Sequence, residues 1–135
     1  MFPPDETEVL FANDAFYAAF GRGDFAAMDD LWARTLPVSC IHPGGPLMLS
    51  RTVVLESWRA ILDSGETAAV THLDATPMIV GPVAWVTCLE RIGDNVLAAT
   101  NIFARENDAW KMTHHQAGPT QAVPKTKTPR PALAN

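Results

Sequence analysis

His42 is the residue that could do chemistry most directly, because it ends a short apolar segment, residues 38–42. A Pro-Gly-Gly-Pro loop at residues 43–46 follows it, and reactive side chains are often presented where a strand meets an irregular loop. An imidazole exchanges protons near neutral pH, so His42 is a candidate general base. The alternative is that His42 only caps its loop by bonding to a carbonyl oxygen.

Cys40 lies two residues before His42, so the two side chains should share one face of a strand. An imidazole beside a thiol can produce a nucleophile. The sequence provides no third group to orient such a pair, and cysteines in strands are usually small core residues. We therefore expect Cys40 and Cys88 to be buried free thiols, not a disulfide.

The adjacent pair His114 and His115 suggests a metal site at first sight. Neighbours on a strand point to opposite faces, however, so this pair cannot hold one ion together. We expect one packed and one partly exposed histidine, with no metal and no cofactor. The motifs for nucleotide binding, serine hydrolysis and structural zinc are missing from the sequence.

Large aromatic residues are spread over the whole sequence. They are Phe16, Trp32, Trp58, Trp85, Phe103 and Trp110. Such residues form an ordinary core, or they wall a cavity for a flat apolar ligand. The sequence leaves both interpretations open.

Three helices are predicted in the first half of the sequence. Asp5, Asp24 and Ser50 are the expected N-caps, and apolar residues recur at helical spacing after each of them. The glycines of residues 21–23 and Gly65 are the expected helix ends.

Residues 67–117 predict strands instead. β-Branched and aromatic residues are divided there by turn signals at residues 81–82, 93–94 and 107–108. This spacing predicts four strands of about ten residues, joined as hairpins and therefore antiparallel. Three helices followed by such a meander indicate an α+β fold with the helices on one face of the sheet.

The composition of the 135 residues indicates one folded domain, which we place at residues 1–118. Residues 119–135 offer little to bury and should form a disordered tail rich in Pro, Lys and Thr. This tail is basic and the net charge is −5, so the body is acidic and nucleic acid is not an expected partner. No apolar run approaches the roughly 20 residues that cross a bilayer, and no secretory signal is recognisable, so we expect a cytoplasmic protein without membrane contact.

Four segments, together with the order of helices and strands, resemble one known superfamily. They are residues 16–24, 41–45, 50–51 and 110–115, with the sequences FYAAFGRGD, IHPGG, SR and WKMTHH. This pattern is similar to the nuclear transport factor 2-like (NTF2-like) superfamily, near its SnoaL-like and ketosteroid-isomerase-like branches. The resemblance implies a cone-shaped, curved antiparallel sheet wrapped around three N-terminal helices, a cystatin-like α+β barrel with a pocket between the layers.

The resemblance also implies roles for particular residues. His42 stands where the isomerases have a general base, and Phe16, which has no hydroxyl, stands where they have a tyrosine. Asn101 stands at the second acid position and could donate a hydrogen bond to developing oxygen charge. The ligand pocket implied in this way consists of Phe16, Trp58, Trp85, Thr87, Leu89, Phe103 and His115.

The same resemblance also implies which side chains face the pocket and which face outward. It places His115 toward the pocket, whereas the apolar pattern of the last strand predicts that His114 faces the pocket. The resemblance also implies a homodimer through the outer face of the sheet, for which Val86, Cys88 and Ala98 are the expected apolar contacts.

Two functions remain open at this point. One is a small-ligand-binding protein with an apolar pocket for an apolar or aromatic molecule, without catalysis. The other is an isomerase, cyclase or hydratase-type enzyme that uses His42 as a base on a small carbonyl, polyketide-like or aromatic compound. Buried polar groups converging on His42 would favour the enzyme, and purely apolar walls would favour the binding protein.

Overall fold

The computed structural model describes residues 4–121, and its elements follow the predicted order of helices and then strands. They are α1 (Pro4–Arg22), α2 (Phe25–Leu31), β1 (Ser39–Ile41), β2 (Leu47–Met48), α3 (Arg51–Asp63), β3 (Val70–Val80), β4 (Val83–Ile92), β5 (Asn95–Glu106) and β6 (Ala109–Pro119). A disordered tail was expected at residues 119–135. Of this tail, residues 122–135 lie outside the described part.

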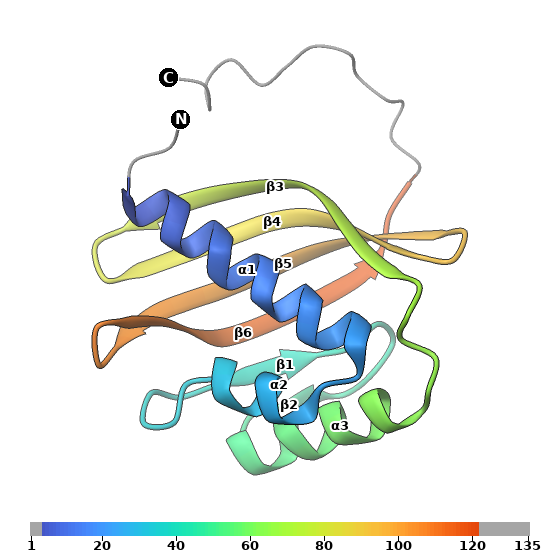
Figure 1. Cartoon of the computed structure of the whole chain (residues 1–135). Coiled ribbons are helices and arrows are strands. Elements are labelled where there is room, and N and C mark those ends of the chain that lie inside the picture. Colours follow the sequence, from blue (N-terminus) through green and yellow to red (C-terminus); the bar gives the residue numbers. More distant parts are fainter. Residues whose placement is uncertain (1–3, 122–135) are drawn as a thin grey trace.

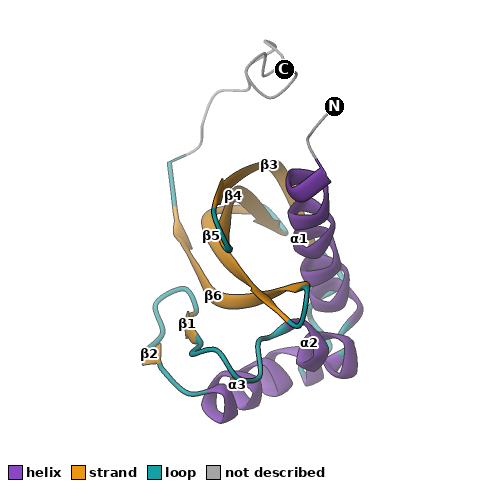
Figure 2. Ribbon diagram, turned by 90° about the vertical axis from the view of Figure 1, so that its left-hand side faces the viewer, coloured by secondary structure: helices purple, strands orange, loops and turns teal. Residues whose placement is uncertain are grey.

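The strands form one six-stranded sheet in the order β2-β1-β6-β5-β4-β3. Figure 2 shows this sheet bending around the interior, with α1 packed across its open side. The predicted α+β cone is confirmed. Two details differ from the expectation. The sheet is mixed, because β1 runs parallel to β6, and β1 also pairs with the two-residue strand β2, which was not predicted.

Helix α1 lies diagonally across the concave face of the sheet (Figure 1). It buries Val9, Phe16, Tyr17 and Phe20 against the strands. The helix begins at Pro4, so Asp5 lies inside its first turn and is not the N-cap that the sequence suggested. Proline is favoured at this position, since the first helical N–H has no partner within the helix.

The other two helices begin where the sequence predicted. The Asp24 side chain accepts a hydrogen bond from the Ala27 N–H, and the Ser50 side chain accepts one from Val53. Each bond satisfies an N–H group at the start of a helix that has no partner within the helix. Helix α3 then packs Trp58, fully buried, below α1 and the sheet.

The loop after α2 is fixed by a single carboxylate. Glu106, at the end of β5, accepts hydrogen bonds from the backbone N–H groups of Arg34, Thr35 and Leu36 and from the Thr35 hydroxyl, at 2.8–3.3 Å. These bonds hold the chain that leads from α2 into β1, and therefore help to place His42 just beyond β1.

Strand β6 contains one extra residue relative to β5. His114 pairs with Ile102, but Met112 pairs with Phe103, so Thr113 has no partner in the ladder. Such a β-bulge shifts the alternation of side chains by one position. Met112 and His115, three residues apart, therefore both face the helices. No helix among the described residues is long and apolar enough to span a membrane.

Candidate functional site

His42 follows β1 directly and turns its ring toward the interior. The ring lies 4.9 Å from Trp58 and 6.2 Å from His115, measured between ring centroids. Its backbone is held by a turn in which Gly45 N–H donates to the His42 carbonyl at 2.8 Å. Gly44, the third residue of this turn, has φ +70°, which glycine adopts without strain. The expected loop cap therefore involves the backbone of His42 and leaves its imidazole available.

The hydrogen bond to Ser57 decides which nitrogen of His42 carries the proton. The Ser57 hydroxyl donates to the Val54 carbonyl at 2.6 Å, so its oxygen can only accept from His42 Nε2 at 2.9 Å. Nε2 therefore carries the proton and Nδ1 keeps a lone pair. Burial lowers the pKa of His42, which keeps this half-buried ring neutral and able to accept a proton at neutral pH.

Cys40 lies beside His42 as expected, with 3.8 Å between Sγ and Nε2. Burial raises the pKa of the Cys40 thiol to about 12, so it remains protonated and is a poor nucleophile. The indole N–H of Trp58 lies near this thiol and acts to lower its pKa, and no other acceptor for it is found among residues 4–121. A thiol is a weak acceptor. Among residues 4–121, the indole N–H of Trp58 therefore has no strong acceptor.

His115 lies behind His42, 1% exposed, and is oriented by Asn101. Its Nδ1 is 2.6 Å from Asn101 Oδ1. The Asn101 amide nitrogen donates to Asn13 Oδ1 at 2.9 Å and to the Tyr17 hydroxyl at 3.2 Å, so its oxygen faces the ring. His115 therefore donates through Nδ1 and keeps a lone pair on Nε2. Both N–H bonds of Asn101 are used within the protein, which makes it a support for His115 rather than a free donor.

Tyr17 and Glu90 complete the buried polar cluster. The Tyr17 hydroxyl donates to Glu90 Oε2 at 2.6 Å and lies 3.3 Å from Cys88 Sγ. Glu90 Oε2 is in turn 3.9 Å from His115 Nε2. Burial raises the pKa values of Tyr17 and Glu90. Tyr17, one residue after Phe16, therefore brings a phenol from α1 into the cluster, where it is a donor to Glu90.

Burial also governs His115. It lowers the pKa of this imidazole to about 3, and the neighbouring rings of His42 and His114 act in the same direction. His72, stacked on Tyr17 at 4.5 Å and bonded to Asp14 at 2.9 Å, joins this cluster to the surface. The site thus contains two neutral imidazoles, each held in one tautomer by its own hydrogen bond.

The expected pocket residues divide between the two faces of the sheet. Phe16, Trp58, Phe103 and His115 lie inside, where Phe16 and Trp58 are 5.0 and 5.6 Å from the His115 ring. Within residues 4–121, the three side chains assigned from β4 do not join them. These side chains are Trp85, Thr87 and Leu89.

Strand β4 presents the alternate set of side chains to the helices. Cys88 and Glu90 contact Tyr17 of α1, and Val86 pairs in register with Asn101. Successive side chains of a strand alternate between faces, so Trp85, Thr87 and Leu89 point to the outer face, and their assignment to the pocket is wrong. For the same reason Val86 and Cys88 cannot contribute to an outer dimer contact.

The bulge at Thr113 resolves the two conflicting expectations for β6. Before the bulge, Trp110 and Met112 point inward, as the apolar pattern predicted. After the bulge, His115 points inward, as the resemblance implied. His114 faces outward, where its Nδ1 is 2.6 Å from the Ser39 hydroxyl. Within residues 4–121, no group of three or more His, Cys, Asp or Glu side chains could hold a metal ion.

A surface pocket of about 600 Å³ lies next to the His42 loop. It is lined by Pro43, Ile92, Asp94, Asn95, Val96, Leu97, Pro119 and Thr120. Leu97 pairs with Pro119, and the next inward pairs along the two strands are Ala99 with Ala117 and Asn101 with His115. Small side chains therefore lie between this pocket and the polar cluster.

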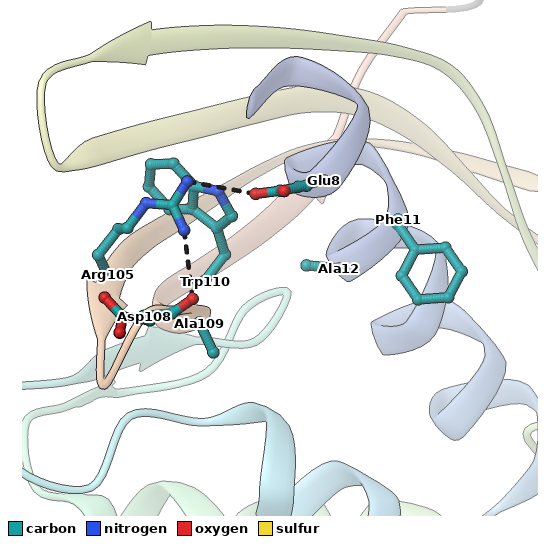
Figure 3. A pocket seen from close by; sticks show the side chains of 7 residues that line it. All are labelled: Glu8, Phe11, Ala12, Arg105, Asp108, Ala109 and Trp110. Atoms are coloured by element: carbon teal, nitrogen blue, oxygen red, sulfur yellow. Dashed lines mark hydrogen bonds and ion pairs between the residues drawn. The ribbon is translucent and has the colours of Figure 1, made fainter. Parts of the chain in front are cut away.

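A smaller pocket, of about 330 Å³, lies at the opposite end of β5 and β6 (Figure 3). Arg105 lies over the Trp110 ring and bonds to Asp5 and Glu8 of α1. Its guanidinium is already paired, so this cation is not free to bind a ligand. We therefore place the candidate site around His42 and not here.

Four polar residues of the site were missed in the sequence analysis, namely Asn13, Tyr17, Ser57 and Glu90. Glu90 had a usable signal: it continues the series Ala84, Val86 and Cys88, in which a carboxylate is out of place. Asn13 and Tyr17 lie four residues apart on α1, on the face that packs against the sheet. Nothing in the sequence distinguishes Ser57 from other polar helix residues.

A curved sheet closed by helices over an apolar core, with a buried polar cluster inside it, defines an α+β cone of the NTF2-like class. The family model of the SnoaL-like domain matches residues 9–120, and the chain belongs to this family. The resemblance to the NTF2-like superfamily is thereby confirmed.

Solved structures agree with this assignment. A proposed dehydratase of the NTF2-like family from Streptomyces avermitilis is 34% identical, with a TM-score of 0.77 over 87% of this chain and 97% of that one. A proposed calcium/calmodulin-dependent protein kinase type II association domain from Thiobacillus denitrificans is 31% identical, with a TM-score of 0.69 over 90% and 98%. A proposed ketosteroid isomerase from Shewanella frigidimarina, 19% identical with a TM-score of 0.70 over 87% and 99%, shares the fold.

Among curated proteins, the F-box protein SKIP8 of Arabidopsis thaliana is 25% identical over 111 residues. The match covers 81% of this chain and 48% of that protein, so the chain spans about half the length of this relative.

Proposed function

We propose that this protein is a proton-transfer enzyme, an isomerase or dehydratase, that acts on a small carbonyl compound with His42 as the base. The observation that carries the proposal is the hydrogen bond from His42 to Ser57, because it leaves a lone pair on Nδ1 of a neutral, half-buried imidazole. The similarity to a proposed dehydratase at 34% identity supports this reaction class.

The chemistry follows from the groups around His42. Its Nδ1 takes a proton from the carbon beside a carbonyl group, and the electron pair moves onto the carbonyl oxygen. The indole N–H of Trp58, whose neighbour is the weakly accepting Cys40 thiol, donates to that oxygen as negative charge develops. Return of the proton to another carbon gives an isomer, whereas its transfer to a departing hydroxyl group gives water and an unsaturated carbonyl compound.

The substrate class follows from the side chains around His42 and the neighbouring pocket. Ala99 and Ala117 lie between the pocket beside Pro43 and the polar cluster, and the rings of Phe16 and Trp58 lie against His115. This arrangement favours a small, mainly apolar or aromatic molecule with one carbonyl group. No cofactor takes part in the proposed reaction.

The test is exchange of carbon-bound protons for deuterium, followed by NMR, in a panel of small ketones and β-hydroxy ketones. We expect exchange or loss of water with the natural protein and a fall of at least about 10²-fold in kcat for His42→Ala. His114→Ala, on the outer face, is the matched control and should keep its rate. Full activity in His42→Ala would falsify the assignment.

Binding without catalysis is the second candidate, and one observation favours it. His115 is 1% exposed and enclosed by Phe16 and Trp58, so the deepest part of the site is filled by the protein's own rings. If aromatic ligands shift the His42 NMR signals while no ketone of the panel reacts, the protein is a binding module.

We further propose a homodimer built on the outer face of the sheet. Met78, Val80 and Val83 are 49%, 61% and 38% exposed there, next to Trp85 and Leu89. An apolar face of this kind commonly marks an interface.

Light scattering at micromolar concentration should give twice the chain mass of 14.6 kDa. Val80→Asp should reduce the measured mass to that of one chain, because it buries an unpaired charge in the contact. Leu49→Asp, which changes an apolar residue outside this face, is the control. A single-chain mass for the natural protein would refute the dimer.

A further inference from the structure

Glu90 is a buried carboxyl group that the proposed reaction does not use. It is 1% exposed on the inner face of β4. Its Oε2 accepts a hydrogen bond from the Tyr17 hydroxyl at 2.6 Å. Among the described residues, no Lys or Arg forms an ion pair with it. A carboxylate buried with so little compensation is costly, so this group retains its proton to higher pH than usual.

His115 presents the complementary group. Because Nδ1 donates to Asn101, the lone pair is on Nε2, and Nε2 is 3.9 Å from Glu90 Oε2. That separation exceeds a hydrogen bond by about 1 Å, a distance that small side-chain rotations close. Asn101 and Tyr17 also contact each other, so one set of bonds fixes both the imidazole and the carboxyl group.

We propose that Glu90 and His115 form a buried carboxyl–imidazole pair that shares one proton, and that Glu90 is the positioning residue that sets the charge next to His42. In the resting pair the proton is on Glu90. Transfer breaks the O–H bond of Glu90 and forms the Nε2–H bond of His115, which leaves a carboxylate and an imidazolium. The reverse step restores the neutral pair, and no other reactant is needed.

The charges around the pair agree with a neutral resting state. Tyr17 from α1 and Cys88 from β4 are uncharged neighbours, and their own pKa values are raised by burial. His72 from β3, whose ring is bonded to Asp14 of α1, acts to lower the pKa of Glu90, but burial is the larger effect and raises it. The Cys40 thiol of β1 also interacts with Glu90 and is kept protonated by burial. His42 and His114 act on His115 in the direction that keeps it neutral.

The consequence for catalysis rests on the function proposed above. A neutral Glu90 leaves the pKa of His42 low, and ionisation of Glu90 at higher pH attracts a proton toward the imidazoles. The base strength of His42 therefore depends on Glu90 through His115, although Glu90 itself touches no substrate.

The proposal is tested on the free protein by ¹⁵N NMR of the histidine rings as a function of pH. At pH 7 we expect His115 to show one N–H nitrogen, Nδ1, and one lone-pair nitrogen, Nε2. Its Nε2 signal should move in a step when Glu90 ionises. Glu90→Gln, which has the same shape, should lose that step, whereas Glu56→Gln on the exposed side of α3 should keep it.

A second variant distinguishes proton sharing from a structural role. Tyr17→Phe removes the donor that stabilises the Glu90 carboxylate, so the step should move to higher pH. An imidazolium at pH 7, or a step that persists in Glu90→Gln, would overturn the proposal. This NMR test uses no substrate and is therefore independent of the proposed function. A protein that shows the step but has no activity would disprove the proposed function and leave the Glu90–His115 pair supported.

Discussion

Two buried carboxyl groups of this protein behave in opposite ways. Glu106, 9% exposed, receives three backbone N–H bonds and one hydroxyl bond, and the backbone donors, led by Arg34, lower its pKa to about 2. Glu90, 1% exposed, has the Tyr17 hydroxyl as its donor, and its pKa is raised by burial. The number of hydrogen-bond donors to a buried carboxyl group, together with its depth below the surface, therefore decides whether the group is ionised. Glu106 is suited to hold a loop, and Glu90 to exchange a proton.

The largest effect should come from removing Glu106. Glu106→Ala leaves three backbone N–H groups of the loop after α2 without their acceptor, so we expect the free energy of unfolding to fall by about 3 kcal/mol. Urea unfolding at pH 7 measures this loss, with the exposed Glu56→Ala as the control. A loss below about 0.5 kcal/mol would show that water replaces the carboxylate and that the comparison with Glu90 fails.

The second largest effect should be on the pH dependence of stability, which should differ in direction between Glu106 and Glu90. Glu106 has a folded pKa below its ordinary value of 4.5, so its contribution is present above pH 4.5 and is lost as the pH falls toward 2. Glu90 has a raised folded pKa, so its contribution is present below pH 4.5 and is lost as the pH rises through the folded value.

Melting temperatures measured from pH 2 to pH 9 provide the test of this second prediction. Glu106→Gln should flatten the acid side of the curve and Glu90→Gln the alkaline side. His115, whose pKa falls from 6.5 to about 3, also destabilises the fold in acid, and this loss should persist in both variants. If both variants changed the melting temperature on the same side of the pH range, the two carboxyl groups would not behave in opposite ways.

The smallest effects concern the residues that donate to Glu106. Thr35→Val removes one hydroxyl donor and keeps the backbone bond, so we expect a loss of about 1 kcal/mol. Arg34→Ala keeps its backbone N–H and removes an exposed ion pair with Asp29, so its loss should be below about 0.5 kcal/mol. Urea unfolding compares the two, and a larger loss for Arg34→Ala would mean that its side chain, not the backbone, holds the loop.

The parts of the fold that depend on local chemistry were predictable. The caps at Asp24 and Ser50 and the hairpin meander follow from residue types that satisfy backbone groups close in sequence. Strand β2 and the parallel pairing of β1 with β6 were not predictable, because a two-residue strand and a long-range pairing arise from packing and leave no periodic pattern.

The site was predictable only in part, for a related reason. His42 and His115 were found from position and resemblance, but Trp85 and Leu89 on the outer face are larger and more apolar than Ala84 and Cys88 on the inner one. The resemblance, which assigned Trp85, Thr87 and Leu89 to the pocket, therefore met no contradiction from the size of the side chains on β4.

The bulge at Thr113 is the place where β6 can best change its length. Deleting this one unpaired residue would leave Met112, His114 and His115 opposite Phe103, Ile102 and Asn101, so the ladder would lose no pair. Plain alternation would then keep His114 outside and His115 inside. We expect descendants of this chain to tolerate insertions and deletions in the hairpin turns and at this bulge, and to retain the length of β6 elsewhere.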